Sequence, residues 1–393
     1  MPEALNQVRN FRFDEMAIQV KDKVDNPAEA DVDRYVGLEH IDPGSLKITR
    51  WGETTDVQSS KLVFKAGDII FGKRRAYQRK LAVADFDGIC SAHAMVLRPK
   101  TDVVLEEFLP FFMQSDAFMN RAVKISVGGL SPTINWRDLA KEEFALPPLE
   151  EQRRIGEVLQ SVEGCLSSTY TALNAAYSAL RSLLLSYLPE VSMDLAHWPI
   201  ARFGDHVEIV DPNPSHRYPN YDDNGVPLVA TQDFEGRDEY VFDKCKRVPR
   251  DVFEQQLARC RFDRDDVVFA RKGILGSARK YGSKEKAFSH TIVVMKPRGE
   301  SVDPDFLLWL VRSDSFMFQI NRNMNSNSGV PTLGVKTLED LQVWLPPKDE
   351  QSNIAQHTRA IDKAAQECEE RRNQLEALKR VFLMQLSQGG RSA

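Results

Sequence analysis

The feature that most constrains this chain of 393 residues is an internal repeat. Residues 60–150 match residues 258–349 at an offset of 198 or 199 positions. The matched segments are 67–74 with 265–272, 91–99 with 289–297, 108–109 with 306–307, 115–118 with 313–316, 132–133 with 331–332, 147–148 with 346–347, and 151–152 with 350–351. So many matches at a nearly constant offset do not arise by chance, so two copies of one structural unit fill the chain.

Each copy has the pattern of a strand-rich domain. Short apolar runs, such as 61–65, 68–71 and 94–97 in the first copy, are broken by glycine, proline and aspartate, which is typical of β-strands. We expect one short helix near 105–123 and its counterpart near 304–320. A loop of glycine, serine and proline follows at 127–133 and at 325–332. A last strand, at 143–146 or 341–345, leads into a double proline.

A heptad pattern follows each double proline. From Ile155 to Tyr187, apolar residues alternate by four and three positions, which predicts a coiled-coil helix over residues 150–187, roughly 55 Å long. Proline and two acidic residues at its start favour a helix N-terminus. The second copy repeats the pattern from Ile354 onward, but Arg372 and Lys379 interrupt it. We expect a shift of register onto Leu378 and Phe382 to restore an apolar seam.

Neither seam is expected to be stable alone, so the two helices should pair. An antiparallel pair fits best, because the second domain must return the chain to the start of the second helix. The predicted fold is therefore α+β, a pseudo-twofold internal repeat of two similar target-recognition domains separated by two long antiparallel coiled-coil helices. We expect the first domain at 1–147, its helix at 148–190, the second domain at 191–345 and its helix at 346–393.

Charge is distributed unevenly along the chain. The net charge is −5, yet residues 67–81 carry five cations and one anion, and residues 271–286 carry six cations and one anion. Such local basic segments can meet phosphate even in an acidic chain. No run of eighteen apolar residues occurs, and five scattered cysteines lack metal-ligand or redox spacing. We therefore expect a cytoplasmic chain with no metal site and no membrane contact.

Two similar domains with two basic segments suit double-stranded DNA, because each domain can bind one half-site. The two copies differ in sequence, so we expect an asymmetric target with a gap that the protein does not contact. Arginine can bind guanine or phosphate through two hydrogen bonds, and a glycine-rich loop can offer N–H groups to phosphate. The candidate DNA-binding residues are Lys73, Arg74, Arg75, Tyr77, Gln78, Arg79, Lys80, His93, Gly129, Ser131 and Thr133 in the first copy, and Gln232, Arg271, Lys272, Arg279, Lys280, His290 and Thr332 in the second.

The two double-proline segments also resemble a known family. Residues 147–159 (PPLEEQRRIGEVL) and 346–355 (PPKDEQSNIA) are similar to the paired motif of specificity subunits of type I restriction–modification systems. The resemblance covers essentially the whole chain. It implies one target-recognition domain per DNA half-site, and helices that set the spacing and dock two copies of a modification (methyltransferase) subunit, to which restriction (translocase–nuclease) subunits can add.

The same resemblance implies which residues dock the modification subunits and where the cofactor binds. The docking candidates are Glu151, Gln152, Arg153, Arg154, Glu350 and Gln351. The second motif departs from the first, with Lys348 and Asp349 in place of leucine and glutamate, so docking at the two helices need not be equal. S-adenosylmethionine is expected in the partner methyltransferase subunit, and no cofactor is expected on this chain.

Two other classes of protein remain open. An enzyme would need a cluster of catalytic carboxylates and lysine or a cofactor-binding loop; the sequence contains none that we recognise, and we predict no catalytic residues. A coiled-coil scaffold of a phage-defence complex would use its helices without direct base readout, and its basic loops would be incidental. Neutralising Lys73, Arg74, Arg75, Arg271 and Lys272 distinguishes these, since only a DNA-binding chain then loses DNA affinity and its salt dependence.

Overall fold

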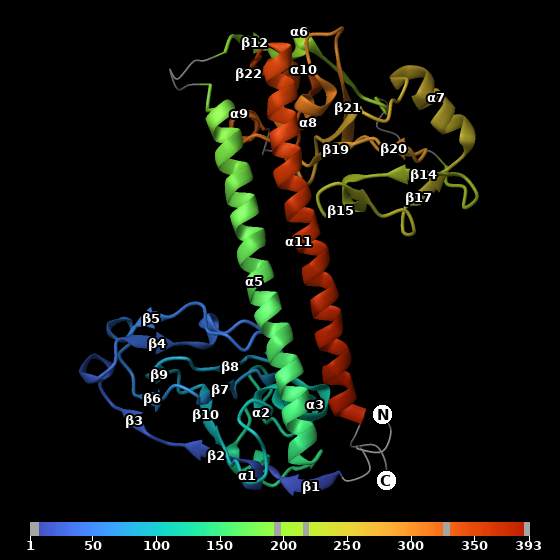
Figure 1. Ribbon diagram of the computed structural model, residues 1–393. Coiled ribbons are helices and arrows are strands. Elements are labelled where there is room, and N and C mark those ends of the chain that lie inside the picture. Colours follow the sequence, from blue (N-terminus) through green and yellow to red (C-terminus); the bar gives the residue numbers. More distant parts are fainter. Residues whose placement is uncertain (1–7, 192–197, 215–219, 325–330, 389–393) are drawn as a thin grey trace. The chain divides into compact units, whose positions relative to one another are not determined.

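The computed structural model describes residues 8–191, 198–214, 220–324 and 331–388 (Figure 1). The chain forms two compact units: one contains residues up to Tyr170 and from Glu370 onward, and the other contains Thr171–Glu369. Two long helices, α5 (Leu149–Tyr187) and α11 (Lys348–Gln388), each contribute one stretch to both units. None of the helices in the described residues is both long enough and apolar enough to cross a membrane.

The first unit contains the first recognition domain. Its strands form a five-stranded sheet of order β3-β6-β9-β4-β5, a four-stranded sheet of order β2-β10-β7-β8, and the pair β1-β11. The strands are β1 (Arg9–Arg12), β2 (Ala17–Val20), β3 (Lys23–Val24), β4 (Arg34–Val36), β5 (Gly52–Glu53), β6 (Lys61–Phe64), β7 (Ile69–Gly72), β8 (Leu81–Val83), β9 (Gly88–Cys90), β10 (Ala94–Pro99) and β11 (Glu143–Leu146). The helices are α1 (Phe13–Met16), α2 (Leu109–Gln114), α3 (Asp116–Lys124) and α4 (Trp136–Leu139), with 3-10 helices η2 (Pro27–Glu29), η3 (Leu38–His40), η4 (Thr54–Asp56) and η5 (Ala76–Gln78).

The second unit contains the second recognition domain. It has a four-stranded sheet of order β13-β21-β18-β19, a three-stranded sheet of order β17-β14-β20, and the pairs β12-β22 and β15-β16. The strands are β12 (Ile200–Arg202), β13 (Val207–Val210), β14 (Val226–Val229), β15 (Phe234–Glu235), β16 (Glu239–Tyr240), β17 (Lys246–Val248), β18 (Val267–Ala270), β19 (Ala278–Lys280), β20 (Ala287–Phe288), β21 (Ile292–Pro297) and β22 (Gln342–Trp344). The helices are α6 (Phe203–His206), α7 (Arg250–Cys260), α8 (Pro304–Arg312), α9 (Asp314–Asn323) and α10 (Val335–Glu339), with the 3-10 helix η6 (Thr231–Asp233).

The expected repeat is confirmed at the level of topology. The sheet β2-β10-β7-β8 of the first domain corresponds strand by strand to β13-β21-β18-β19 of the second, and the pair β1-β11 corresponds to β12-β22. Apolar side chains of each four-stranded sheet pack against the helices of the same domain. Phe71 of β7 packs against Phe118 of α3 in the first domain, and Phe269 of β18 packs against Phe316 of α9 in the second. The predicted α+β class and the two similar domains are therefore confirmed.

A single short helix was expected near 105–123 and near 304–320, and this detail is wrong. Each segment contains two helices, α2 and α3 in the first domain and α8 and α9 in the second, with a break at Ser115 and at Ser313. Both serines have extended backbones, and their hydroxyl oxygens accept hydrogen bonds from the N–H groups of Phe118 and Phe316. These serine N-caps end one helix and begin the next.

The two long helices run antiparallel, as expected. In the first unit the Tyr170 hydroxyl of α5 donates to the Glu376 carboxylate of α11 at 2.8 Å. In the same unit Glu163 of α5 pairs with Lys379 of α11, so positions rise along α5 as they fall along α11. In the second unit the Tyr177 hydroxyl donates to Glu369 at 2.6 Å. The buried face of α5 follows the predicted heptads, with Leu159, Val162, Leu166, Thr169, Leu173 and Leu180 buried.

The expected shift of register in α11 is wrong at Leu378, whereas Phe382 packs against the core of the first unit as expected. Leu378 is 44% exposed, whereas Lys379, which continues the heptad spacing, is only 7% exposed. The Lys379 ammonium donates to the carboxylate of Glu163 on α5 and, at 2.6 Å, to the carbonyl oxygen of Gly44. A lysine can therefore occupy the seam because both its charge and its hydrogen-bonding groups have partners there.

Candidate nucleic-acid interface

Three segments of the first domain meet where β7 ends. The N–H groups of Lys73 and Arg74 donate to the carbonyl oxygen of His93, at 3.1 and 3.2 Å. The N–H of Arg75 donates to the Pro132 carbonyl at 2.7 Å, and that of Ile134 donates to the Lys73 carbonyl at 2.9 Å. The basic loop (73–80), the turn before β10 (91–93) and the glycine-rich loop (127–134) thus form one surface, which we call the loop cluster.

The second domain has the same loop cluster. The N–H of Arg271 donates to the Thr291 carbonyl at 3.0 Å, and the N–H of Leu333 donates to the Arg271 carbonyl at 2.9 Å. A β-bridge joins Lys272 to Thr332, as another joins Arg74 to Thr133 in the first domain. Residues 325–330 of the predicted glycine-rich loop lie outside the described residues. Backbone hydrogen bonds therefore build the cluster in both copies, independently of the side chains it carries.

In the first domain, Lys73, Arg74 and His93 lie together in the loop cluster. Arg74 Nη1 lies 3.0 Å from His93 Nε2. Burial and then the charges of Arg74 and Lys73 lower the pKa of His93, so its ring is neutral at pH 7 and Nε2 can accept from the guanidinium. Burial, followed by repulsion from Lys23, also lowers the pKa of Lys73. Burial is the larger cause of both shifts, and repulsion from neighbouring cations is the smaller one.

Arg75 is exposed and holds a left-handed backbone with φ of 55°. Arg79 has a φ of 52°, and these two residues flank η5. In the first domain the hairpin is closed by a hydrogen bond from the Gly72 N–H to the Lys80 carbonyl, and in the second by one from the Ala270 N–H to the Ser277 carbonyl. Counted from these closing bonds, Arg75 corresponds to Gly273 and Arg79 corresponds to Gly276. These glycines have φ of 85° and 82°. The first domain thus places two arginines where the backbone favours glycine, and such strain concentrates at functional sites.

The remaining candidates of the first domain differ in availability. Tyr77 and Gly129 are exposed, and Gln78, Ser131 and Thr133 are half-buried. The Arg79 guanidinium pairs with Asp116 of α3 at 2.6 Å, and the Lys80 ammonium donates to the Leu38 carbonyl at 2.5 Å. Sequence reasoning missed Leu130, which is 97% exposed at the tip of the glycine-rich loop. Its exposure could not be read from the sequence, because a single leucine between glycine and serine in a loop gives no periodic signal for which side it faces.

The second domain presents fewer cations at its loop cluster. Lys272 and Thr332 are half-buried there, and Gln232 is exposed on η6, whose Thr231 N–H donates to Thr291 Oγ1 at 3.4 Å. The carbonyl of the half-buried His290 accepts from Arg271 Nε at 3.1 Å. The Arg271 side chain is buried and pairs with Asp211 at 2.6 Å. It therefore stabilises the loop cluster from inside rather than extending from it.

Arg279 and Lys280 do not reach the loop cluster at all. Both lie in β19, because the hairpin of the second domain closes at Ser277. Arg279 is 1% exposed, its guanidinium lies 3.8 Å from the ring centroid of Phe234, and burial lowers its pKa. The Lys280 ammonium donates to the Asp265 carbonyl at 2.8 Å. The basic segment 271–286 is therefore not one surface, which corrects the sequence interpretation.

The two glutamines of the docking motif are buried. In the first unit Gln152 Nε2 donates to the carbonyls of Val103 (3.1 Å) and Pro147 (2.9 Å), and Oε1 accepts from the Leu105 N–H at 3.0 Å. Gln351 repeats this arrangement with Ser301, Pro346 and Asp303 as partners.

Because both side chains are fully engaged, Gln152 and Gln351 fasten each long helix to its own domain and are not free to dock another subunit. The other docking candidates remain accessible to different degrees. Arg153 and Arg154 are exposed, and Glu151 pairs with Arg154 at 2.6 Å. Glu350 is half-buried.

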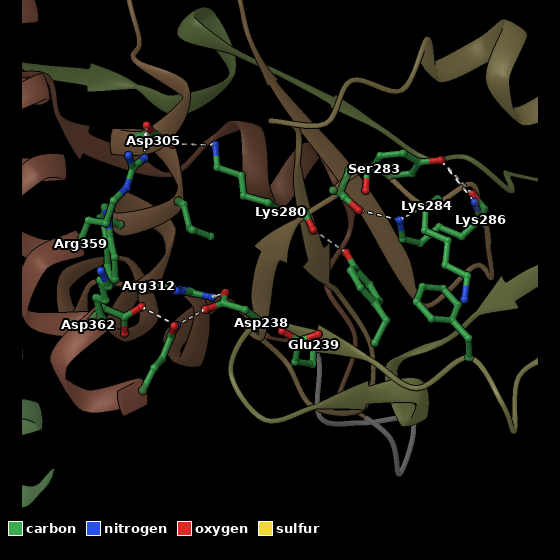
Figure 2. Close-up of a pocket in the computed structure, with 18 residues that line it drawn as sticks. Asp238, Glu239, Lys280, Ser283, Lys284, Lys286, Asp305, Arg312, Arg359 and Asp362 are labelled. Atoms are coloured by element: carbon green, nitrogen blue, oxygen red, sulfur yellow. Dashed lines mark hydrogen bonds and ion pairs between the residues drawn. The ribbon is translucent and has the colours of Figure 1, made fainter. Parts of the chain in front are cut away.

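A charged cavity of about 500 Å³ lies in the second unit (Figure 2). Side chains of β16, β19, α8 and α11 line it. Asp305 pairs there with Arg359 and, at 3.5 Å, with Lys280. Among the described residues, no group of three or more His, Cys, Asp or Glu could hold a metal ion.

Comparison with known proteins identifies the class of protein that this fold and these loop clusters represent. The family described as Type I restriction modification DNA specificity domain matches residues 33–176 and 220–377. The chain belongs to this family and carries two matched segments, one in each copy of the repeat. The class expected from the double-proline motifs, a specificity subunit of a type I restriction–modification system, is thereby confirmed.

Individual relatives agree with this assignment. The chain is 27% identical over 190 residues to the type I restriction enzyme EcoDI specificity subunit of Escherichia coli, a match that covers 48% of this chain and 42% of that protein. It is 21% identical over 345 residues to the type I restriction enzyme MjaVIII specificity subunit of Methanocaldococcus jannaschii, covering 82% of this chain and 76% of that protein. The crystal structure of a type I restriction–modification S subunit from M. genitalium shares the fold, with a TM-score of 0.64, 14% identity, and coverage of 97% and 96%.

Proposed function

We propose that this chain is the non-catalytic DNA sequence-specificity subunit of a type I restriction–modification complex in the cytoplasm. Each recognition domain binds one half of an asymmetric, bipartite DNA target through its loop cluster. The observation that carries the proposal is that both domains build this cluster with equivalent backbone hydrogen bonds yet place different side chains on it. A conserved scaffold with divergent exposed residues suits two different half-sites.

The long helices set the separation of the half-sites and dock two copies of the modification subunit. The exposed Arg153 and Arg154 near the start of α5 support a docking role there. Methyl transfer from S-adenosylmethionine takes place in those partner chains, and restriction subunits join the same assembly. The cations of the loop clusters hold the DNA backbone, while exposed side chains such as Tyr77 and Gln232 contact bases.

The decisive experiment is a genome-wide methylation map of cells that express this chain with the modification subunit encoded beside it. We expect two short half-sites separated by a fixed gap. Replacing residues 1–147 with the first domain of a related subunit should change one half-site and leave the other unchanged. A contiguous target, or a target that is insensitive to the replacement, would contradict the proposal.

A salt titration separates this proposal from the scaffold alternative. Changing Lys73, Arg74 and Arg75 together to glutamine should weaken DNA binding and reduce the slope of log affinity against log salt by ~0.9 for each lost phosphate contact. The matched control changes three exposed lysines of the same domain, Lys21, Lys65 and Lys141, to glutamine. If both triple variants bind DNA with the wild-type slope, the loops are incidental and the scaffold reading holds.

A further inference from the structure

A buried ion pair joins the first domain to its stretch of the helix pair. Glu163 of α5 pairs with Lys379 of α11, and both side chains are largely buried. The Lys379 ammonium also donates to the carbonyl oxygen of Gly44, which lies in the loop between η3 and β5. In the same loop the Lys47 ammonium donates to Ser167 of α5 at 2.9 Å. One carboxylate thus holds a cation that contacts both helices and the domain.

In the second unit an ion pair between a buried carboxylate and a half-buried arginine joins the domain to the helix pair. Asp362 of α11 pairs with Arg237 at 2.5 Å, and Arg237 lies at the tip of the β15–β16 hairpin. Its guanidinium lies 5.2 Å from the ring centroid of Trp309 and 6.0 Å from that of Tyr177 on α5. Figure 2 shows Asp362 on the helix side of the cavity and Asp238 on the hairpin side, and the Gln366 amide donates to both carboxylates at 3.1 and 3.0 Å.

The two acids occupy equivalent positions of the repeat. Glu163 and Asp362 are separated by 199 residues, as are Gln152 and Gln351. The domain contacts are equivalent too. Val36 ends β4, which pairs in parallel with β9, and Val229 ends β14, which pairs in parallel with β20. Gly44 lies eight residues after Val36, and Arg237 lies eight residues after Val229. Each acid therefore faces the same point of its own domain.

The cation is what differs between the two units. In the first unit it comes from the opposite helix, at Lys379. The repeat equivalent of Lys379 is Leu180, which is 4% exposed in the apolar seam of the second unit. There the cation comes from the domain instead, at Arg237. The two units thus neutralise equivalent acidic residues with cations from different elements, the opposite helix in the first unit and the recognition domain in the second.

We propose that Glu163 and Asp362 are paired anchor positions, each fixing the orientation of one recognition domain on the helix pair and so positioning its half-site contacts. The effect on DNA binding rests on the proposed function, whereas the contacts of the two acids do not depend on it. In the second unit, rotation of the domain would take Arg237 away from the buried carboxylate of Asp362, which is strongly disfavoured. In the first unit, rotation would instead remove the Gly44 carbonyl, the acceptor that the domain offers to Lys379. Burial raises the pKa of Asp362 and Arg237 opposes this shift, which agrees with a carboxylate that depends on its partner.

A transplant of the cation tests the equivalence in the full-length chain. Arg237→Ala should speed amide hydrogen exchange in the β15–β16 hairpin, including the Val241 N–H that donates to Asp233, by about tenfold. Adding Leu180→Lys supplies an ammonium from α5, as Lys379 does from α11, and should return exchange to near the wild-type rate. The matched control adds Leu180→Met, which introduces no charge and should not restore protection.

Two outcomes of this exchange experiment would overturn the inference. One is wild-type protection of the hairpin in Arg237→Ala. The other is equal rescue by Leu180→Met and Leu180→Lys, which would show that packing and not charge is restored. A cooperative thermal transition for each variant verifies that it folds. Arg237→Lys, which keeps the charge, provides a milder variant that should exchange close to the wild-type rate.

The consequence for DNA is measured with the complete complex on targets whose gap is one base pair shorter or longer. Arg237→Ala should lower discrimination between gap lengths about tenfold while leaving base preference within each half-site unchanged, and Leu180→Lys should restore it. Unchanged discrimination in Arg237→Ala would refute the positioning role. If the wild-type complex shows no gap preference, the proposed function fails, whereas the exchange result still decides whether the anchors exist.

Discussion

Arg75 adopts a backbone conformation that its counterpart Gly273 adopts without a side-chain penalty. Left-handed backbone at a residue other than glycine costs about 1 kcal/mol or more, so the first domain retains the arginine at the expense of stability. The guanidinium is exposed and Nε donates to Ser131 Oγ at 3.3 Å, which orients it at the loop cluster. This combination of strain and exposure favours a contact with DNA over a role in the fold.

Arg75→Gly should therefore separate stability from binding. We expect a free energy of unfolding that is unchanged or up to ~1 kcal/mol higher, because relief of strain exceeds the entropic cost of glycine. Specific DNA affinity should fall about tenfold, as expected for one lost charge-assisted contact. The matched control is Arg261→Gly, since Arg261 has φ of 48° at the end of α7 and should gain stability without losing DNA affinity. Equal losses of affinity in both variants would contradict a specific role for Arg75.

Lys286 supplies a pH-dependent prediction. Its ammonium is buried, donates to the carbonyls of Tyr281 and Lys284 at 2.6 Å, and lies 3.8 Å from the Tyr281 ring centroid. Burial and then repulsion from Lys284 lower the pKa of Lys286 to about 8. Between this pH and the pKa of an unfolded lysine, the unfolded state binds more protons than the folded state. The contribution of Lys286 to stability therefore rises with pH in that window.

Comparison with Lys286→Met measures this contribution. The unfolding free energy of the wild type relative to Lys286→Met should rise by about 2 kcal/mol from pH 7 to pH 10. Chemical denaturation at several pH values gives the difference curve, in which the titration of other groups cancels. Lys244→Met, which removes an exposed lysine of the same domain that does not perturb Lys286, should give a nearly flat difference curve. A flat curve for Lys286→Met as well would mean that the buried ammonium keeps its ordinary pKa.

Residue roles were the least predictable part of this protein. The sequence placed Lys73, Arg74 and Arg75 correctly in one loop, because the preceding apolar strand fixes where the loop begins. It could not show that Arg279 is buried, because the hairpin of the second domain is shorter and its closing hydrogen bond, at Ser277, has no sequence signal. Similarly, the burial of Arg271 depends on Asp211, a partner 60 residues away.

At the scale of elements, Gln152 and Gln351 connect each long helix to its domain. Each side-chain amide satisfies two carbonyls and one N–H that precede or flank the helix. Removing the amide would leave three backbone groups, most of them half-buried, without this partner, and each group that is then unsatisfied costs about 1 kcal/mol or more. The motif Pro-Pro-x-x-Glu-Gln is thus explained as a junction within the fold.

Gln152→Leu should lower the unfolding free energy of its unit by about 3 kcal/mol, and Gln351→Leu should do the same for the other unit. The matched controls are Gln160→Leu and Gln356→Leu, since both glutamines are exposed on the same helices. Differential scanning calorimetry of the full-length chain measures the effect. If the buried and the exposed substitutions shift the thermal transition equally, the hydrogen bonds of Gln152 and Gln351 do not stabilise the junction.

The helices were the most predictable elements, because heptad spacing is a local and periodic signal. Their antiparallel direction agrees with the sequence analysis, and α5 at Leu149–Tyr187 covers the expected heptad segment. The register of α11 was mispredicted because Lys379 reads as an interruption, whereas its partners Glu163 and Gly44 lie far away in the sequence. The breaks at Ser115 and Ser313 were missed for the opposite reason, since a serine cap inside an apolar run is a weak local signal.

At the scale of the whole molecule, the repeat predicted the class of fold and the family together. Matching loop clusters, matching helix junctions and matching anchor positions occur at nearly constant offsets, whereas the side chains exposed at the loop clusters differ. This difference between shared backbone contacts and unshared exposed side chains is expected if both copies keep the same fold while each copy binds its own half-site. It also means that base preference cannot follow from the repeat, because it depends on the residues that the copies do not share.

The spacing function leads to a prediction for the complete subunit. Removing one heptad from each helix, residues 171–177 from α5 and 369–375 from α11, keeps the seam in phase because the removed segments include the paired Tyr177 and Glu369. A heptad is about 10.5 Å of helix, which corresponds to roughly three base pairs of duplex. The methylation map should then show both half-sites unchanged and a gap shorter by about three base pairs. Removing three residues from each helix instead breaks the heptad phase and should abolish methylation, whereas an unchanged gap in the heptad variant would show that the helices do not set the spacing.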